Sequence, residues 1–171
     1  MSVLDARTIA QVEKEALNVL EEFQIDSLPV EPTGLAKCKG YRVEYRDLSE
    51  ENFRGVLSDR KIAIDSTIES SSMKRFIVAH ELGHGVLGHG TSGYYNESSE
   101  YDVPCSEREA MANLFARALL MPKHYLQKAV EIFKSKDGNS SYSSCEEYLS
   151  DIFGVTERRV RDRLEECELG I

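Results

Sequence analysis

The stretch His80-Glu81-Leu82-Gly83-His84 is the part of the chain from which the fold is best interpreted. His80 and His84 are four residues apart, so they lie on one face of any helix that contains them. Glu81 lies about 100° around such a helix from His80. Two imidazoles on one face can bind a single zinc ion, and a neighbouring carboxylate can accept a proton from water there. The stretch therefore predicts a metal-dependent hydrolytic site carried by a helix.

The helix around this stretch is expected to run from about Met73 to Leu87. Ser72 is placed to cap its start, and Gly88 and Gly90 are placed to end it. Gly83 inside the helix costs roughly 1 kcal/mol relative to alanine. We therefore expect another helix or backbone segment to approach this glycine closely.

Upstream of this helix, the pattern predicts one long helix, one short helix and three strands. Apolar residues recur at three- and four-residue steps from Asp5 to Phe23, with Asp5 as N-cap. A short helix is expected around residues 33–37. The expected strands are Tyr41 to Tyr45, which alternates as a half-buried strand would, Phe53 to Leu57, and Lys61 to Asp65. Ser58-Asp59-Arg60 is a plausible hairpin turn between the last two strands. We place the strand 61–65 at a sheet edge, where an extended substrate can pair with it.

Downstream, the pattern predicts an irregular segment followed by four helices. Residues 90–105 are rich in Gly, Ser and Tyr and show no periodicity. Helices are expected at Ser106 to Leu120, after Pro122, from Ser144 to Phe153 and from Glu157 to Glu168. We predict a single α+β domain over residues 1–171, in which a small, mainly antiparallel sheet packs against helices. A C-terminal helical pair at 141–171 is expected to pack on this body.

Composition narrows the classes of function. Apolar residues make up 41% of the 171 residues, charged residues make up 30%, and the net charge is −9. An acidic chain lacks the basic field that attracts nucleic acids and anionic membranes, so we expect neither as a direct partner. No apolar run approaches the roughly 20 residues that span a bilayer, and the first residues show no signal pattern. The four cysteines form no CxxC pair, so we expect reduced thiols and a cytoplasmic protein.

A catalytic zinc needs a third protein ligand and an open position for water. His89 is the tenth residue of the motif, whereas a metzincin pattern requires a histidine at the eleventh. Glu109 lies on the expected helix at 106–120, one turn before Asn113, which could hold a ligand histidine through its other ring nitrogen. Ser106-x-x-Glu109 is also a capping-box pattern, so Glu109 could instead cap its own helix, with Glu107 as another candidate ligand. Cys105 is a further, weaker candidate.

HELGHGVLGH at 80–89 followed by EAMANLFARALLMP at 109–122 resembles the ImmA/IrrE family of zinc metallopeptidases. That family combines HExxH with a downstream Glu followed by Ala-Asn and an apolar helix ending in Leu-Leu-Met-Pro. The resemblance implies that His80, His84 and Glu109 bind one Zn²⁺ per chain on a zincin-like active-site helix. It also implies that Glu81 is the catalytic proton acceptor in a zinc-dependent endopeptidase. The implied substrate is a DNA-binding, helix-turn-helix transcriptional repressor of a phage, mobile element or stress regulon, cleaved at a specific site.

Three questions stay open at the level of sequence. The oxyanion-stabilising group has five candidates, which are Tyr94, Tyr95, Tyr101, His124 and Tyr125. The domain could instead be a non-catalytic antirepressor or toxin–antitoxin-type binding module with a structural zinc. The arginine-rich C-terminal helix is compatible with DNA binding, but its acidic residues favour a solvated, charge-laced helix.

Overall fold

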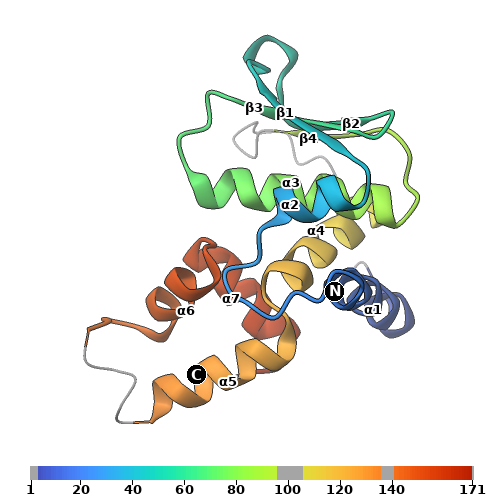
Figure 1. The fold of residues 1–171 in the computed structure, drawn as a ribbon. Helices are drawn as coiled ribbons and strands as arrows, with labels where there is room; N and C mark the ends of the chain where they lie inside the picture. The colour runs from blue at the N-terminus through green and yellow to red at the C-terminus, as the bar shows by residue number, and fades with distance from the viewer. Residues whose placement is uncertain (1–3, 96–105, 136–140, 171) are drawn as a thin grey trace.

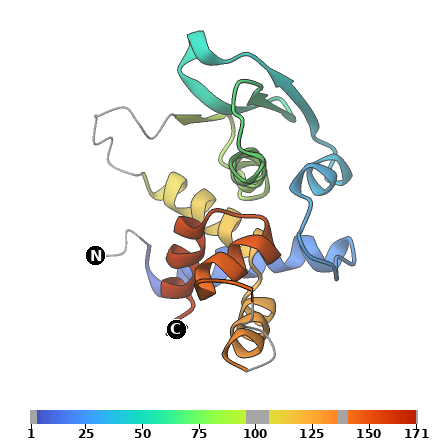
Figure 2. The same ribbon diagram turned by 90° about the vertical axis from the view of Figure 1, so that its left-hand side faces the viewer.

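Helix α3 (Ser71–Val86), which contains the His80–His84 stretch, lies between a small sheet and the remaining helices (Figures 1 and 2). The structure is a computed structural model that describes residues 4–95, 106–135 and 141–170. The sheet covers one side of α3, and α4 (Glu107–Leu120) packs along the opposite side. The two histidines therefore lie at the interface on which the fold is built.

The chain has the α+β architecture that its sequence predicts. The other helices are α1 (Ala6–Glu22), α2 (Pro32–Cys38), α5 (Lys123–Lys134), α6 (Cys145–Phe153) and α7 (Glu157–Glu166). The strands are β1 (Arg42–Arg46), β2 (Phe53–Ser58), β3 (Lys61–Asp65) and β4 (Ser92–Tyr95), and a 3₁₀ turn spans Ser49–Glu51. The sequence does not predict strand β4, because residues 90–105 show no periodicity and are expected to be irregular.

The sheet has the order β1-β3-β2-β4. Strand β2 is antiparallel to both β3 and β4, so the sheet is mainly antiparallel as expected, whereas β1 pairs with β3 in parallel. Asp59 and Arg60, both with positive φ, form the two-residue hairpin turn between β2 and β3.

The prediction that β3 is an edge strand is wrong, because β3 pairs on both sides and the edges are β1 and β4. The physical reason is visible in its burial. Ile62, Ala63 and Ile64 are all buried in succession, as in a strand covered on both faces, rather than alternating. In the edge strand β1, the expected alternation also fails, since Tyr45 is 50% exposed.

Helix α3 is buried on every side from Phe76 to His84. Its N-cap is Ser70, whose hydroxyl accepts a hydrogen bond from the backbone N–H of Met73 at 3.2 Å. The predicted cap at Ser72 is therefore wrong by two residues. A Cβ atom built on Gly83 would lie 2.8 Å from Phe115 Cδ1 on α4. The close neighbour expected at this glycine is therefore α4.

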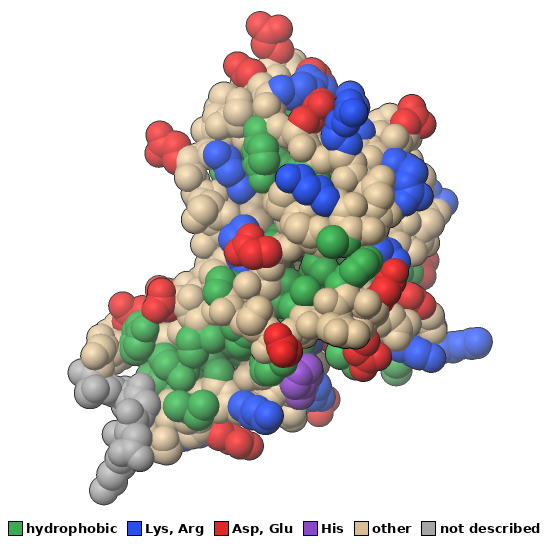
Figure 3. Space-filling model, viewed as in Figure 1, with side chains coloured by type: hydrophobic (Ala, Val, Ile, Leu, Met, Phe, Trp, Pro, Cys, Tyr) green, Lys and Arg blue, Asp and Glu red, His purple; other side chains and the backbone are tan. Residues whose placement is uncertain are grey.

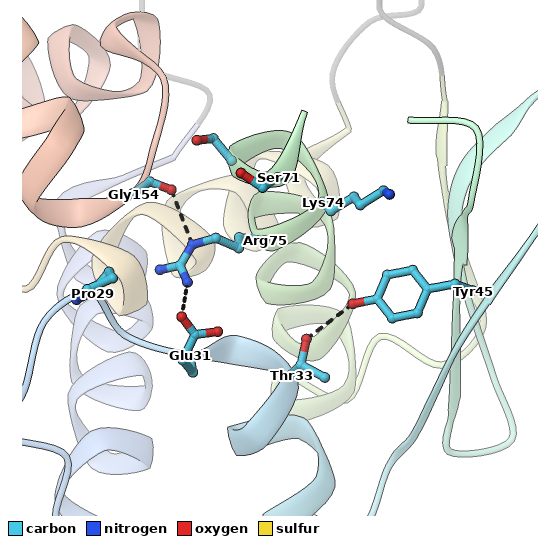
Figure 4. Close-up of a pocket in the computed structure, with 9 residues that line it drawn as sticks. Pro29, Glu31, Thr33, Tyr45, Ser71, Lys74, Arg75 and Gly154 are labelled. Atoms are coloured by element: carbon cyan, nitrogen blue, oxygen red, sulfur yellow. Dashed lines mark hydrogen bonds and ion pairs between the residues drawn. The ribbon is translucent and has the colours of Figure 1, made fainter. Parts of the chain in front are cut away.

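Arg75 fastens the first turns of α3 to two distant segments (Figure 4). It donates to the backbone oxygens of Gly154 and Val30 and forms an ion pair with Glu31. A cavity of about 650 Å³ opens beside it, at the opposite end of α3 from His84. The cavity is lined by Pro29, Glu31, Thr33, Tyr45, Ser71, Ser72, Lys74, Arg75 and Gly154.

The C-terminal helix α7 is not simply a solvated, charge-laced helix, as its sequence had indicated. Arg163 is fully buried, and it forms a two-pronged ion pair with Glu13 of α1 while donating to the backbone oxygen of Met121. Arg159 is also buried; it donates to the Tyr94 hydroxyl at 2.9 Å and lies over the ring of Phe76. Two of the four arginines of α7, Arg159 and Arg163, therefore lie in the protein interior and do not face solvent.

The surface shows no single dominant character on the face drawn in Figure 3. Charged side chains of both signs are interspersed over the sheet end, while apolar side chains gather over the helical half. The exposed large apolar side chains of the helical half include Leu17 of α1 and Ile132 of α5. Within the described residues, none of the helices combines the length and the apolar character that crossing a bilayer requires.

Candidate metal centre

Two helices bring three ligand-type side chains together in the interior. His80 and His84 project from α3 with 0% and 1% of their surface exposed, and Glu109 projects toward them from the first turn of α4. The Nε2 atoms of the two histidines are 3.0 Å apart. Each lies 3.2 Å from one carboxylate oxygen of Glu109. The Nε2 atoms of the two histidines and the Glu109 carboxylate thus converge on one point.

These distances fit a tetrahedral divalent ion. With bonds of about 2.0–2.1 Å, neighbouring ligand atoms of a tetrahedral zinc are separated by about 3.3 Å. The three observed separations are within a few tenths of an ångström of that value. In the described parts of the chain, His80, His84 and Glu109 are the group of His, Cys, Asp or Glu residues with metal-ligand spacing. Three protein ligands would leave a fourth position open.

The charge of Glu109 favours a cation at this point. Burial alone would raise the pKa of its carboxyl group, but hydrogen bonds with His80 and His84 lower that pKa to about 2. The carboxyl group is therefore ionised at neutral pH. A carboxylate between two imidazoles is a donor set suited to zinc and to related divalent metals.

Glu81 is fully buried beside the two histidines but turns toward the sheet. Its Oε2 accepts a hydrogen bond from the Ser92 hydroxyl of β4 at 2.5 Å, while its Oε1 has no partner among the described residues. Burial raises the pKa of Glu81, although neighbouring His80 opposes that rise. A buried oxygen without a partner is costly, and this one lies on the helix that carries the two histidines, where it is able to accept a hydrogen bond.

Strand β2 passes directly over Glu81. A Cβ atom built on Gly55 would lie 2.3 Å from Ile77 Cγ2 and 3.4 Å from Glu81 Oε1. Only glycine allows this approach without displacing α3. The sequence contained a signal for it, because a glycine inside a strand often marks a close neighbouring group.

The outer ring nitrogens of both histidines also have partners. His80 Nδ1 lies 3.1 Å from Asn113 Oδ1, which is the placement that the sequence predicted for Asn113. His84 Nδ1 lies 2.9 Å from His89 Nδ1. His89 is therefore next to the cluster but outside it, and no pattern in the sequence predicts its contact with His84.

The other candidate ligands lie differently. Glu107 is exposed and does not join the cluster, and Cys105 lies outside the described residues. Ser106 does cap α4, because its hydroxyl accepts the backbone N–H of Glu109 at 3.3 Å. The Glu109 side chain nevertheless reaches the histidines, so this residue takes part in both arrangements.

Of the five candidates for oxyanion stabilisation, Tyr94 contacts the cluster. Its ring packs edge-on against His80, with ring centroids 4.8 Å apart, and its hydroxyl accepts from Arg159. His124 and Tyr125 pack against each other on α5. The Tyr95 side chain and Tyr101 are outside the described part of the chain.

Comparison with known proteins identifies a family. The model of a peptidase family, described as the IrrE N-terminal-like domain, matches residues 36–165. The match extends over α3 and α4 and includes every residue of the cluster. A search of the curated proteins gives no match.

Proposed function

The chain belongs to the peptidase family of the IrrE N-terminal-like domain, and from this premise we propose that it is a zinc-dependent endopeptidase that cleaves a protein substrate. The observation that carries the proposal is the convergence of His80, His84 and Glu109 beside a buried carboxylate, Glu81, with one unpaired oxygen. Family membership supports metallopeptidase chemistry. The donor set supports a divalent metal, and zinc is the ion that two histidines and a glutamate most commonly hold in such enzymes.

The roles of the side chains follow from their positions. His80, His84 and Glu109 would hold the ion, which would supply Lewis-acid polarisation of a peptide carbonyl and lower the pKa of water. Glu81 would accept a proton from the attacking water through its free Oε1 and deliver it to the departing amine. Ser92 fixes the other oxygen of Glu81, so the free one keeps its direction. Asn113 orients His80.

The edge strand β4 is the proposed place for an extended substrate. Among the described residues β4 pairs with β2 alone, so its other edge offers backbone groups for strand addition. Ser92 of β4 contacts Glu81 directly, and a peptide added beside it would therefore run past the reacting groups. Strand β4 thus takes the substrate-pairing role that the sequence analysis assigned to β3, because β3 lies inside the sheet.

The specific substrate that we propose is a DNA-binding transcriptional repressor, cleaved at one site so that its genes are released. The support for this substrate is the family resemblance of the two motifs, together with a net charge of −9 that is compatible with docking on a basic protein. The enzyme itself would then need no DNA contact and would act in the cytoplasm.

The test compares the wild type with Glu81→Gln, which keeps the shape of the side chain but removes its basicity. Each zinc-loaded protein is incubated with a lysate of its source cells, and new protein N-termini are mapped by mass spectrometry. Glu107→Gln on exposed α4 surface serves as the matched control. We expect new termini in one regulator with the wild type and the control, and none with Glu81→Gln.

Two outcomes would overturn the proposal. New termini produced equally by Glu81→Gln would remove this residue from the chemistry. Release of a regulator without any cleavage, by a Glu81→Gln protein that still holds its metal, would identify a non-catalytic antirepressor with a structural zinc.

A further inference from the structure

After α3 ends, the chain turns back so that His89 lies next to His84. Leu87 is the C-cap of helix α3, Gly88 has a φ of +70°, and the backbone N–H of His89 donates to the carbonyl of His84 at 2.9 Å. Gly88 likewise donates to the carbonyl of Gly85. These two bonds form a Schellman motif, in which the last residue commonly packs its side chain on the residue five positions earlier. That contact is usually apolar, but here it joins two imidazoles.

The contact between the two rings is a hydrogen bond between their Nδ1 atoms. These atoms are 2.9 Å apart, and the ring planes cross at 68°. His84 directs Nε2 toward the point where the three ligand-type groups converge. A metal ion bound at Nε2 would leave the ring proton of His84 on Nδ1, so His84 would then donate and His89 would accept.

Helix α4 restrains this arrangement from the other side. Arg108 Nη1 lies 3.4 Å from the backbone oxygen of His89, and Arg108 is the neighbour of Glu109. His89 is only partly buried, whereas His84 is almost completely buried. The partly exposed ring of His89 thus lies against the buried ring of His84.

We propose that His89 is a positioning residue that holds the His84 ring in the tautomer and orientation needed for metal binding. This inference rests on the metal site of the proposed function. His89 does for His84 what Asn113 does for His80, with a ring nitrogen in place of an amide oxygen. Partners of this kind typically change metal affinity 10- to 100-fold when they are removed.

The experiment measures zinc affinity of the full chain by competition with a chromophoric chelator. His89→Leu removes the acceptor and keeps side-chain bulk, while His89→Asn retains an acceptor oxygen near the position of Nδ1. His124→Leu, on exposed α5 and outside the cluster, is the matched control. Visible absorption of the Co²⁺-loaded proteins reports the geometry of the ligands independently of activity.

We expect His89→Leu to weaken zinc binding 10- to 100-fold and to alter the Co²⁺ spectrum. His89→Asn should stay within a few-fold of the wild type, and His124→Leu should match it. Wild-type affinity in His89→Leu would overturn the inference while leaving the proposed function intact. Equal losses in His89→Leu and His89→Asn would also overturn it, because packing rather than the hydrogen bond would then be responsible. A wild type that binds neither ion would refute the proposed function and this inference with it.

Discussion

Replacing Gly83 by alanine tests the close contact between the two helices that form the candidate metal centre. The added Cβ would lie 2.8 Å from Phe115 Cδ1, 3.1 Å from Cγ and 3.2 Å from Cβ. Carbon atoms prefer separations of about 3.5–4.0 Å, so the clash involves the root of the Phe115 side chain and not only its mobile end. Phe115 is fully buried and cannot move aside. The helices must therefore separate by a few tenths of an ångström.

The magnitude follows from two opposing terms. Alanine gains about 1 kcal/mol of helix propensity over glycine, while overpacking a core costs about 1–3 kcal/mol. Gly34 in α2 provides the control, because a Cβ there would meet nothing within 4 Å. Gly34→Ala should stabilise the protein by up to about 1 kcal/mol. The difference between the two variants then isolates the overpacking cost.

The assay is urea unfolding of the metal-free full chain, followed by far-UV circular dichroism. Gly83→Ala should be less stable than Gly34→Ala by about 1–3 kcal/mol. Zinc binding should weaken as well, because α4 carries Glu109 and metal–ligand distances tolerate only about 0.2 Å. If Gly83→Ala proved as stable as Gly34→Ala, and bound zinc as tightly as the wild type, the reasoning about the interface would be refuted.

Three further predictions test other parts of the structure. Glu13→Ala removes the two-pronged partner of the buried Arg163, which keeps a longer contact of 3.4 Å with Glu166, and should cost about 3 kcal/mol in denaturant unfolding; a loss under about 1 kcal/mol would mean that Glu166 and water compensate for the missing carboxylate. Ser70→Ala should cost about 1 kcal/mol, whereas Ser72→Ala should change stability by only a few tenths; the reverse order would restore Ser72 as the cap. Asn113→Ala should weaken zinc binding about 10- to 100-fold in chelator competition without unfolding the chain, and unchanged affinity would show that its hydrogen bond to the metal-site histidine is unimportant.

Local patterns accounted for the helices because their signals lie within a few residues. Periodic apolar residues located α1, α4 and α5, and capping residues located their starts to within one or two positions. The capping box at Ser144 is a close match: its hydroxyl accepts the N–H of Glu147, while the Glu147 carboxylate reaches back to Ser143 rather than to Ser144. Three consecutive serines at the start of α3, residues 70–72, left the choice of its N-cap undetermined.

The sheet was harder to predict because pairing is non-local. The two strands of the β2–β3 hairpin were found from their turn, but nothing near β1 indicates that it pairs in parallel with β3. Strand β4 has only four residues, too few for a period to emerge, and it exists because β2 offers it an edge.

The buried arginines of α7 show the same limit. Its sequence mixes acids and bases as a solvated helix does, and the partner of Arg163 is 150 residues away. At the candidate metal site, His80, Glu81 and His84 were predictable because they lie within one five-residue motif. Glu109 remained ambiguous by spacing alone because the same residue also fits a helix cap, and it was the family resemblance that favoured it as the third ligand.

The metal stoichiometry of the full chain, measured by native mass spectrometry, tests the central claim most directly. The wild type and Glu107→Ala, which removes an exposed carboxylate from the same turn of α4, should each carry one zinc ion. Glu109→Ala should lose the ion or hold it far more weakly. One zinc in all three proteins would reduce Glu109 to a helix cap and contradict the three-ligand site.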